Sequence, residues 1–424
     1  MRRRLDLHWQ ILIALLLGVG AGLLWPQGSA TPGGFEPVTA FAFVGSLFLR
    51  GLKMVIVPLV AASIIAGVAG IGAGRGLGRL FAKTFSWYIA TSLIAILTGL
   101  LLVNLVRPGV DAQGPVAARL GLTAPVADLA AGLEERGAGD IIGIVQRMVP
   151  DNPLAAAAAG DMLALIFFCI ILGLGVAALP EEMRLRQLGF WESLLAAMMK
   201  VTGWVMATAP VGIFALVAQI TATSGFAAFG PLARYGLVVL GALTLHAFVT
   251  LPLLVSVVGR LPALRHMRAV APALLTAFST RSSSATLPLT MECVENRAGV
   301  SNRVTSFVLP LGATINMDGT ALYECVAAMF IAQAYGIDLG FGVQFVVVLT
   351  ALLASIGAAG IPAAGLVMMS IVLEAAGLPL EGIALILAID PVLDMCRTTV
   401  NVFSDTCVAV VVARSEGETG VLAG

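Results

Sequence analysis

The stretch AIDPVLDMCRTTVNVFSDTCVAVVVA, residues 388–413, places four ionisable side chains in a helix-length segment that is otherwise rich in apolar residues. Of the 424 residues, 59% are hydrophobic and only 11% are charged, whereas soluble domains carry about 25% charged residues. Ionisable side chains within a membrane span are costly, and they normally face a cavity or each other. The stretch therefore predicts a membrane helix that lines a polar site inside a bundle of helices.

Six polar side chains of this predicted helix share one face. At about 100° per residue they fall on a stripe roughly 100° wide. The guanidinium of Arg397 is a planar fork that matches a carboxylate, Asp394 one turn away suits an ammonium group, and Asn401 can donate to a second carboxylate. Such a set fits a zwitterion with an acidic side chain. The six residues are Asp390, Asp394, Arg397, Thr398, Asn401 and Asp405.

An internal ion pair with a purely structural role is the alternative explanation of these charges. We expect Asp390 to pair with Arg397 in that way. This pair would leave Asp394 and Asp405 available to ligands, so the binding site is the favoured interpretation.

Apolar segments long enough to cross a bilayer, which needs about 20 residues, precede this helix. Several exceed one bilayer thickness and should tilt. The Arg and Lys side chains between them fall on one side if each segment crosses once, and the positive-inside rule makes that side cytoplasmic, with both termini. Residues 107–160 then form an extracytoplasmic loop with a short surface helix, and the protein belongs in the plasma membrane, which is the inner membrane of a bacterium. The six segments are 9–26, 41–72, 82–106, 161–180, 189–222 and 233–258.

Beyond residue 260, polar and Gly- or Pro-containing stretches interrupt the apolar pattern at 279–288 (STRSSSATLP), 316–320 (NMDGT) and 355–365 (SIGAAGIPAAG). Ordinary loops are the alternative, but the flanking pieces are too short to cross a bilayer singly. Irregular backbone at membrane depth is tolerated where it is buried in protein or lines a cavity. We therefore predict two re-entrant helical hairpins and one broken helix, which is a recurrent way to bind substrate and ions in transporters.

The interrupted stretches offer different chemistry. Asn316 and Asp318 supply hard oxygen ligands that suit sodium. The serines at 282–284 have no histidine or lysine base nearby in the sequence, so a hairpin tip that contacts a ligand is favoured over an intramembrane hydrolase. Pro362 and its neighbouring glycines predict a second, pliable tip that acts as a gate. The three histidines are too far apart in sequence to suggest a metal motif.

Glu324 lies four residues after Thr320, which puts it on the same helical face about one turn deeper. An acid at that depth is costly when ionised, which makes it a candidate proton carrier. The alternative is a permanent pair with Arg281 or a fixed hydrogen bond.

The motifs TRSSSATLP, FVLPLGATINMDGTALYE, ASIGAAGIPAAG and LDMCRTTVNVFSD together resemble the glutamate transporter family, the dicarboxylate/amino acid:cation symporters. They are closest to the sodium-coupled aspartate and glutamate carriers. The similarity is close over about residues 262–413 and weaker at 86–92 (SWYIATS) and 149–168 (VPDNPLAAAAAGDMLALIFF). Chance does not produce several long motifs in one order.

The resemblance implies an all-α polytopic membrane protein with eight transmembrane spans and two re-entrant hairpins, which assembles as a homotrimer and works as an elevator. A scaffold holds the first, second, fourth and fifth spans, and a mobile transport domain holds the rest. The implied segments are 1–81 (scaffold), 82–106 (transport domain), 107–160 (loop), 161–222 (scaffold) and 233–424 (transport domain).

The resemblance also implies three sodium sites and one substrate site. The first sodium site would use Asp405 with carbonyls of Gly312, Asn316 and Asn401. The second would use carbonyls of Thr314, Ser355, Ile356 and Ala358, and the third would use Tyr88, Thr91, Ser92, Asn316 and Asp318. Substrate would contact Ser282, Ser283, Thr320, Ile361, Gly365, Asp394, Arg397, Thr398 and Asn401. Glu324 matches a glutamate that is linked to proton co-transport in the vertebrate carriers.

Two departures bear on the ions. Arg281 and Met395 look like the archaeal aspartate carriers rather than the potassium-returning vertebrate ones. NMDGT and Asp405 differ from the motifs of proton-only bacterial relatives and so favour sodium. Relatives for four-carbon dicarboxylates lack Asp at the position of Asp394, and relatives for neutral amino acids lack Arg at that of Arg397.

Acidic amino acids are therefore the favoured substrate, with neutral amino acids, dicarboxylates or an anion channel as alternatives. One methylene separates aspartate from glutamate, and the sequence does not decide between them. Neither an organic cofactor nor a nucleic-acid partner is expected, since 24 basic residues balance 24 acidic ones.

Overall fold

A computed structural model describes residues 7–29, 36–70, 78–111, 114–116, 146, 149–159, 161–224, 229–357, 364–387 and 389–422. Within these ranges the chain is helical apart from turns, short connections and one antiparallel pair of two-residue strands, β1 (Val110–Asp111) and β2 (Gly114–Pro115). The all-α class expected from the sequence is confirmed.

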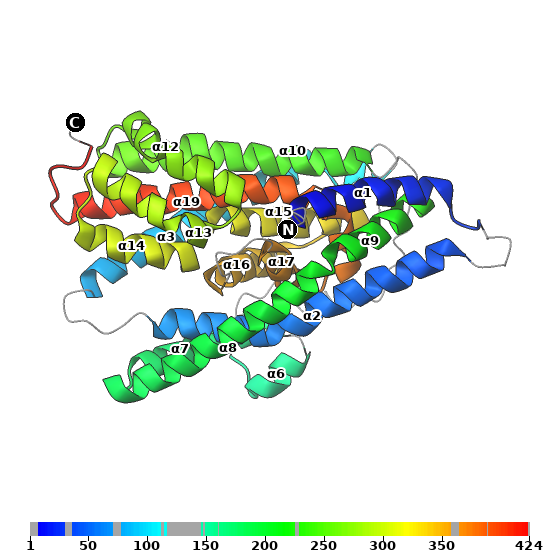
Figure 1. Cartoon of the computed structure of the whole chain (residues 1–424), viewed down its shortest axis with the longest axis horizontal. Helices are drawn as coiled ribbons and strands as arrows, with labels where there is room; N and C mark the ends of the chain where they lie inside the picture. The colour runs from blue at the N-terminus through cyan, green and yellow to red at the C-terminus, as the bar shows by residue number, and fades with distance from the viewer. Residues whose placement is uncertain are drawn as a thin grey trace, which may run out of the picture.

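In the amino-terminal half, α1 and α2 pack along α9, and α2 also contacts α7 and α8. Figure 1 shows α2, α8 and α9 running together along one side of the molecule. Asp161 begins α7 by accepting a hydrogen bond from the Ala164 N–H, as expected of a helix N-cap. The helices are α1 (Leu7–Leu24), α2 (Pro37–Ala69), α3 (Gly78–Val106), α6 (Pro153–Ala159), α7 (Met162–Ala177), α8 (Glu181–Ala207) and α9 (Ala209–Ser224).

In the carboxyl-terminal half, α12, α14 and α15 pack against α19, and α10 and α15 pack against α3. Figure 1 shows α10, α12 and α19 side by side on the side of the molecule opposite α2 and α8. The helical segments are α10 (Phe229–Leu245), η3 (His246–Thr250), α11 (Leu251–Leu253), η4 (Leu254–Val258), α12 (Ala263–Thr280), α13 (Ser283–Glu292), η5 (Cys293–Arg297), α14 (Asn302–Ile315), α15 (Asp318–Tyr335), α16 (Phe341–Gly357), α17 (Ala364–Ala375), η6 (Leu380–Gly382), α18 (Ile383–Ile386) and α19 (Asp390–Ser415).

Three described helical segments are long and apolar enough to cross a bilayer, namely Arg79–Val106, Gly230–Val258 and Val392–Ser415. The predicted span at 189–222 consists of two helices, α8 and α9, bent by 49°, and together they are long and apolar enough for a fourth crossing if the pair is one broken span. Pro210 lies in the first turn of α9, where the N–H that proline lacks is not needed for a hydrogen bond within the helix. Other apolar helices are shorter, so the count of eight spans stays a prediction.

The segment after α10 contains two π-helical turns, η3 and η4, on either side of Pro252. The N–H of Leu251 donates to the carbonyl of His246, five residues earlier. Pro252 has no N–H and its ring crowds the preceding turn, and a wider turn relieves both problems. The η3 turn begins at His246, which lies in the interior.

Helix α15 lies at the centre of the packed core, and all of its residues from Asp318 to Tyr335 are buried. Helix α3 approaches it closely at Gly99, where a Cβ atom would lie 2.8 Å from Val326. Only glycine permits this approach of two helices. A helix that is buried on every side is positioned by its neighbours, so polar groups on it are fixed in place.

The predicted interruptions are found where the structure describes them. Helices α12 and α13 pack against each other and are joined by a turn at Arg281 and Ser282. Helix α14 ends at Ile315 and α15 begins at Asp318, so Asn316 and Met317 are not helical. The second predicted tip, which includes Pro362, lies outside the described residues.

Residues that follow α19 form hydrogen bonds with the beginnings of two other helices. Glu416 accepts hydrogen bonds from Arg79 at 2.8 Å and Lys83 at 2.6 Å, both on α3. Glu418 accepts from the Ser301 N–H at 2.9 Å, next to the start of α14. This end of α19 is thereby held against α3 and α14.

Candidate functional site

The polar stripe predicted for the last helix faces the protein interior. All six of its residues, from Asp390 to Asp405, are buried. Burial of charged side chains is tolerated only where they are paired or bind a ligand. The partners of each residue therefore define what this site can bind.

Arg397 is 1% exposed and is surrounded on several sides. Its Nη2 lies 3.0 Å from Oδ1 of Asp390 and 3.0 Å from Oδ1 of Asp394. Its Cζ lies 3.8 Å from the ring centroid of Tyr323, a cation–π arrangement. The backbone of Gly365 covers the guanidinium so closely that a Cβ there would lie 2.8 Å from Nη1.

The expected pair of Asp390 with Arg397 is confirmed, but Asp394 is not left free by that pair. It is bonded to Arg397 as well, because residues three apart on a helix face the same side. Nη1 of Arg281 lies 3.9 Å from Oδ2 of Asp394. Even so, among the described residues Oδ2 of Asp394 and both Nε and Nη1 of Arg397 have no hydrogen-bond partner. The site thus presents an unused acceptor beside unused donors.

The turn between α12 and α13 reaches this region. Arg281 has φ 55° and ψ 32°, the left-handed conformation that is uncommon for a residue with a side chain. Ser282 caps α13 by accepting from the Ala285 N–H at 3.1 Å, and Ser283 donates to the Ala313 carbonyl at 3.2 Å. These serine contacts are with backbone groups, which fits a ligand-facing tip rather than a nucleophile.

Asn401 connects α19 to the start of α15. Its Oδ1 accepts from the Gly319 N–H at 2.8 Å, and its Nδ2 donates to Oγ1 of Thr320 at 3.1 Å. A Cβ on Gly319 would lie 2.8 Å from the carbonyl oxygen of Arg397, so the two helices touch there. Thr320, Asn401 and Arg397 are therefore neighbours, as the substrate set requires.

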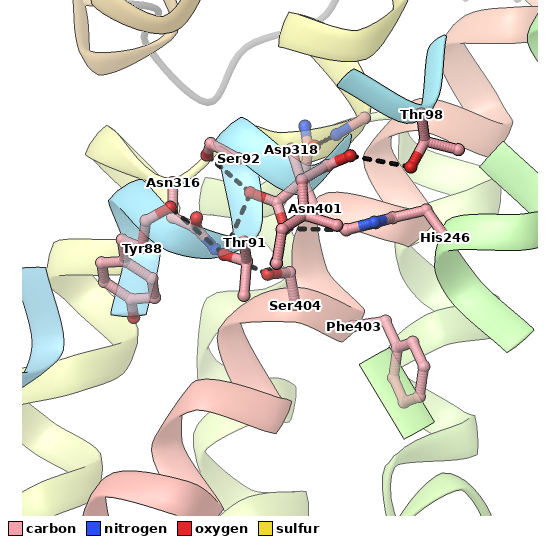
Figure 2. Close-up of polar contacts among 12 residues, drawn as sticks. Tyr88, Thr91, Ser92, Thr98, His246, Asn316, Asp318, Asn401, Phe403 and Ser404 are labelled. Atoms are coloured by element: carbon pink, nitrogen blue, oxygen red, sulfur yellow. Dashed lines mark hydrogen bonds and ion pairs between the residues drawn. The ribbon is translucent and has the colours of Figure 1, made fainter. Parts of the chain in front are cut away.

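A second polar cluster lies at the break between α14 and α15 (Figure 2). Oδ1 of Asp318 accepts from Ser92 at 2.6 Å and from Thr91 at 3.3 Å, both on α3. Oδ2 accepts from Ser404 at 2.7 Å, and Nε2 of His246 lies 3.0 Å from it. Asp318 is fully buried, and all of these contacts come from other segments.

The first predicted sodium set adjoins this cluster. Nδ2 of Asn316 donates to Oδ1 of Asp405 at 2.8 Å. Gly312 packs against both the Asp405 carboxylate and the Tyr88 hydroxyl, leaving no room for a side chain. The Tyr88 hydroxyl donates to the Val308 carbonyl at 2.8 Å. The Ser404 hydroxyl accepts from the same Nδ2 of Asn316 and donates to Asp318, so the two acids at 318 and 405 are linked through Asn316 and Ser404.

The donor set of these clusters fits sodium. Oδ1 of Asn316 is buried and has no hydrogen-bond partner among the described residues, so it is an acceptor available to a cation. The hydroxyls of Thr91 and Ser92, the Tyr88 carbonyl and the Asp318 carboxylate add hard oxygens nearby. No group of three or more His, Cys, Asp or Glu that could hold a metal ion occurs in the part of the chain that the structure describes.

The remaining predicted sodium set is only partly described. Thr314 lies in the last turn of α14 and its hydroxyl donates to the Leu311 carbonyl, while Ser355 is buried on α16 and its hydroxyl donates to the Leu352 carbonyl. These two helices contact each other. Ile356 belongs to the last turn of α16. Ala358, and Ile361 of the substrate set, lie outside the described residues.

Glu324 is fully buried on α15. Within the described ranges, neither of its carboxylate oxygens has a hydrogen-bond partner. The ion-pair partner found for Arg281 is Asp394, so the expected alternative of a fixed Glu324–Arg281 pair is not found.

Three residues at the site were missed by the sequence reasoning. His246 is an ionisable side chain in an apolar span, which alone marks a functional candidate. Ser404 follows Arg397 by seven positions and so returns to the same helical face. Tyr323 had no such signal, because only the packing of α15 against α19 brings its ring to Arg397.

Comparison with known proteins finds similarity over nearly the whole chain. Residues 7–415 match the sodium:dicarboxylate symporter family. The chain is 36% identical to the proton/glutamate-aspartate symporter of Escherichia coli (strain K12), over 97% of this chain and 93% of that protein. It is 36% identical to excitatory amino acid transporter 3 of Mus musculus, over 95% and 85% of the two chains. It is 34% identical to the proton/sodium-glutamate symport protein of Geobacillus stearothermophilus, over 98% and 96%.

Proposed function

The chain belongs to the sodium:dicarboxylate symporter family, and from this premise we propose that it is a secondary active symporter that imports aspartate or glutamate together with sodium. The single observation that supports this substrate class is that hydrogen-bonding groups without partners lie next to each other on the last helix. Oδ2 of Asp394 lacks a partner among the described residues, as do Nε and Nη1 of Arg397. An acceptor for an ammonium group beside donors for a carboxylate suits an acidic amino acid.

Each substrate group has a partner in this proposal. The side-chain carboxylate binds Arg397, the ammonium group binds Asp394, and the α-carboxylate binds the second N–H of Asn401 with the Ser282–Ser283 tip. Thr320, Thr398 and the backbone of Gly365 and Ile361 complete the enclosure. Binding replaces the contact of Asp394 with Arg397, so the substrate inserts its charges between two groups that neutralise each other without it.

Sodium is the proposed coupling ion, bound at sites around Asp318, around Asp405, and between Thr314 and the Ser355 region. The named relatives differ on this point, since the Escherichia coli protein is named for protons and the Geobacillus protein for protons and sodium. The unpartnered Oδ1 of Asn316 beside the Asp318 carboxylate supports a cation that takes hard oxygen ligands. Asn401 serves both an ion site and the substrate site, and Asn316 is shared by two ion sites, which links the binding events.

Glu324 is the proposed proton carrier. A carboxyl group that is enclosed in α15 without a described partner is costly to ionise in place. A proton bound there during import would remove that cost. The bound proton would then be released on the cytoplasmic side with the substrate.

The proposed architecture has eight spans and two re-entrant hairpins, with the amino and carboxyl termini cytoplasmic. A scaffold of 1–81 and 161–222 forms the contacts of a homotrimer, and 82–106 with 233–424 moves as an elevator. The close packing of α9 with α1 and α2, of α2 with α7 and α8, and of α3 with α15 and α19 supports this division.

Competition uptake into proteoliposomes tests the proposal. Purified protein would take up radiolabelled aspartate with and without an inward sodium gradient, against excess glutamate, succinate or serine. We expect glutamate to compete, succinate and serine to compete poorly, and uptake to require sodium. If only succinate competes, the protein is a dicarboxylate carrier, and if only serine competes, it is a carrier of neutral amino acids. An anion current that needs no substrate, without any uptake, would identify the protein as a channel.

A further inference from the structure

The carboxylate of Asp318 is divided between two sets of partners. Oδ1 faces Ser92 and Thr91 of α3. Oδ2 is held by Nε2 of His246 at 3.0 Å and by the hydroxyl of Ser404 at 2.7 Å. Figure 2 shows His246 and Ser404 reaching Asp318 from two segments other than α3. Neither residue belongs to the sodium or substrate sets given above.

His246 is a hydrogen-bond donor in this arrangement. A carboxylate oxygen only accepts, so the hydrogen is assigned to Nε2 of the ring. Nδ1 has no hydrogen-bond partner among the described residues and then carries no hydrogen in the neutral ring. The side chain is fully buried at the first position of the π-helical turn η3. Such turns are frequent at functional sites.

Ser404 is fixed by two contacts at once. Its hydroxyl donates to Oδ2 of Asp318 and accepts from Nδ2 of Asn316 at 3.1 Å. The same Nδ2 donates to Oδ1 of Asp405. Because both hydrogen-bonding directions of the hydroxyl are used, its donor is fixed on Oδ2.

Resting on the sodium coupling proposed above, we propose that His246 and Ser404 are positioning residues of the sodium site at Asp318. They occupy Oδ2, so that Oδ1 is the oxygen presented to the ion beside Thr91 and Ser92. Partners that orient a metal ligand without touching the metal typically change its affinity 10- to 100-fold when they are removed. Loss of either donor would let the carboxylate turn and leave the ligand geometry undefined.

Four variants and one control test this role. His246→Leu and Ser404→Ala remove the donors, His246→Gln retains an N–H at similar reach, and Asp318→Asn removes the site itself. His266→Leu is the matched control, because His266 is also a buried histidine but lies 3.1 Å from the hydroxyl of Thr406 rather than from an acid.

The readout is thermal unfolding of the purified protein without substrate, at rising sodium with choline keeping the ionic strength constant. A ligand that binds the folded state raises the unfolding temperature with its concentration. We expect His246→Leu and Ser404→Ala to raise about 10- to 100-fold the sodium concentration that lifts the unfolding temperature by a fixed increment above its sodium-free value. His246→Gln should shift it less than about 3-fold, because the donor is kept, and His266→Leu should follow the wild type.

The outcomes separate this inference from the proposed function. Each curve is read against its own sodium-free midpoint, so a variant of lower basal stability is still informative. If sodium stabilises the wild type and Asp318→Asn shifts the curve while His246→Leu and Ser404→Ala do not, the positioning role is rejected and sodium coupling stands. If His266→Leu shifts the curve equally, the effect comes from lost packing of a buried side chain, and the positioning role is again rejected. If sodium does not stabilise the wild type, both proposals fail.

Discussion

The guanidinium of Arg397 on α19 lies 3.8 Å from the ring centroid of Tyr323 on α15. The ring supports the cation on one face, while Asp390 and Asp394 hold its Nη2 at the edge. Arg397 is therefore fixed in the interior before any substrate arrives. This preorganisation lowers the cost of ordering the side chain on binding.

Tyr323→Leu should weaken acidic amino acid binding about 3- to 30-fold, because a buried cation–π contact contributes about 0.5–2 kcal/mol. Tyr323→Phe keeps the ring that lies over the guanidinium, so its affinity should stay within about 2-fold. Isothermal titration with aspartate at saturating sodium measures both. Equal losses in the two variants would show that the hydroxyl, and not the ring, matters.

Arg397→Cys should abolish aspartate and glutamate uptake, a loss of at least about 100-fold if two charged hydrogen bonds disappear. It should admit neutral amino acids, since Arg397 is the base on the polar stripe of α19. Uptake of labelled aspartate and serine into proteoliposomes measures the switch, and Arg397→Lys is the control that keeps a charge. Unchanged aspartate affinity in Arg397→Cys would contradict the assignment.

Asp405→Asn and Asp318→Asn should each raise the sodium concentration needed for half-maximal aspartate uptake, by about 10-fold or more because an anionic ligand is lost. Asp338→Asn, at an exposed acid on the connection after α15, is the control and should behave as the wild type. Substrate affinity should also rise steeply with sodium, since the two sites are linked. Full uptake in sodium-free buffer, driven by a pH gradient alone, would overturn sodium coupling.

Glu324→Gln should remove the pH dependence of uptake while keeping its sodium dependence. In the wild type, uptake should slow as external pH rises, because fewer molecules carry the proton that import requires. Both proteins are compared across a pH series with internal potassium present or absent. Identical profiles would reject the proton role, and stimulation by internal potassium would show that the Arg281 and Met395 pattern was misleading.

Glu416→Gln should make the stability of the folded protein less dependent on pH at acidic pH. Hydrogen bonds from Arg79 and then Lys83 lower the pKa of Glu416 from its usual 4.5 to about 2. A group whose pKa is lowered on folding stabilises the protein above its unfolded pKa, and this contribution is lost as the pH falls from about 4.5 towards 2. On acidification from about pH 5 to about pH 3, the unfolding temperature of the wild type should therefore fall more steeply than the unfolding temperature of Glu416→Gln. Parallel curves would mean that the pair contributes nothing.

Local spacing was enough to predict the polar stripe and the broken helix. The stripe from Asp390 to Asp405 follows from helical periodicity alone, and the break at Asn316 and Met317 follows from residues that disfavour a helix interior. The pairing of Asp394 with Arg397 was also accessible, because residues three apart on a helix face each other, yet it was not expected.

Contacts between distant segments could not be predicted in the same way. His246 and Asp318 are separated by 72 positions and meet only because η3 and α15 pack in one core. The bend between α8 and α9 depends on how both helices lie along α2, which Pro210 permits but does not dictate. Periodicity reports which face of a helix is polar, but it does not report which other helix that face meets.

The complete enclosure of α15 has a consequence for how the protein is assembled in the membrane. This helix carries Asp318 and Glu324, both fully buried, and acids in a membrane helix are costly unless other segments pair with them. Its partners Asn401 and Ser404 lie on α19, which is synthesised after α15. The polar groups of α15 therefore gain these partners only after α19 has been synthesised. A chain truncated before residue 390 would leave its polar groups unmatched, and membrane quality control should degrade it rather than retain a partial bundle.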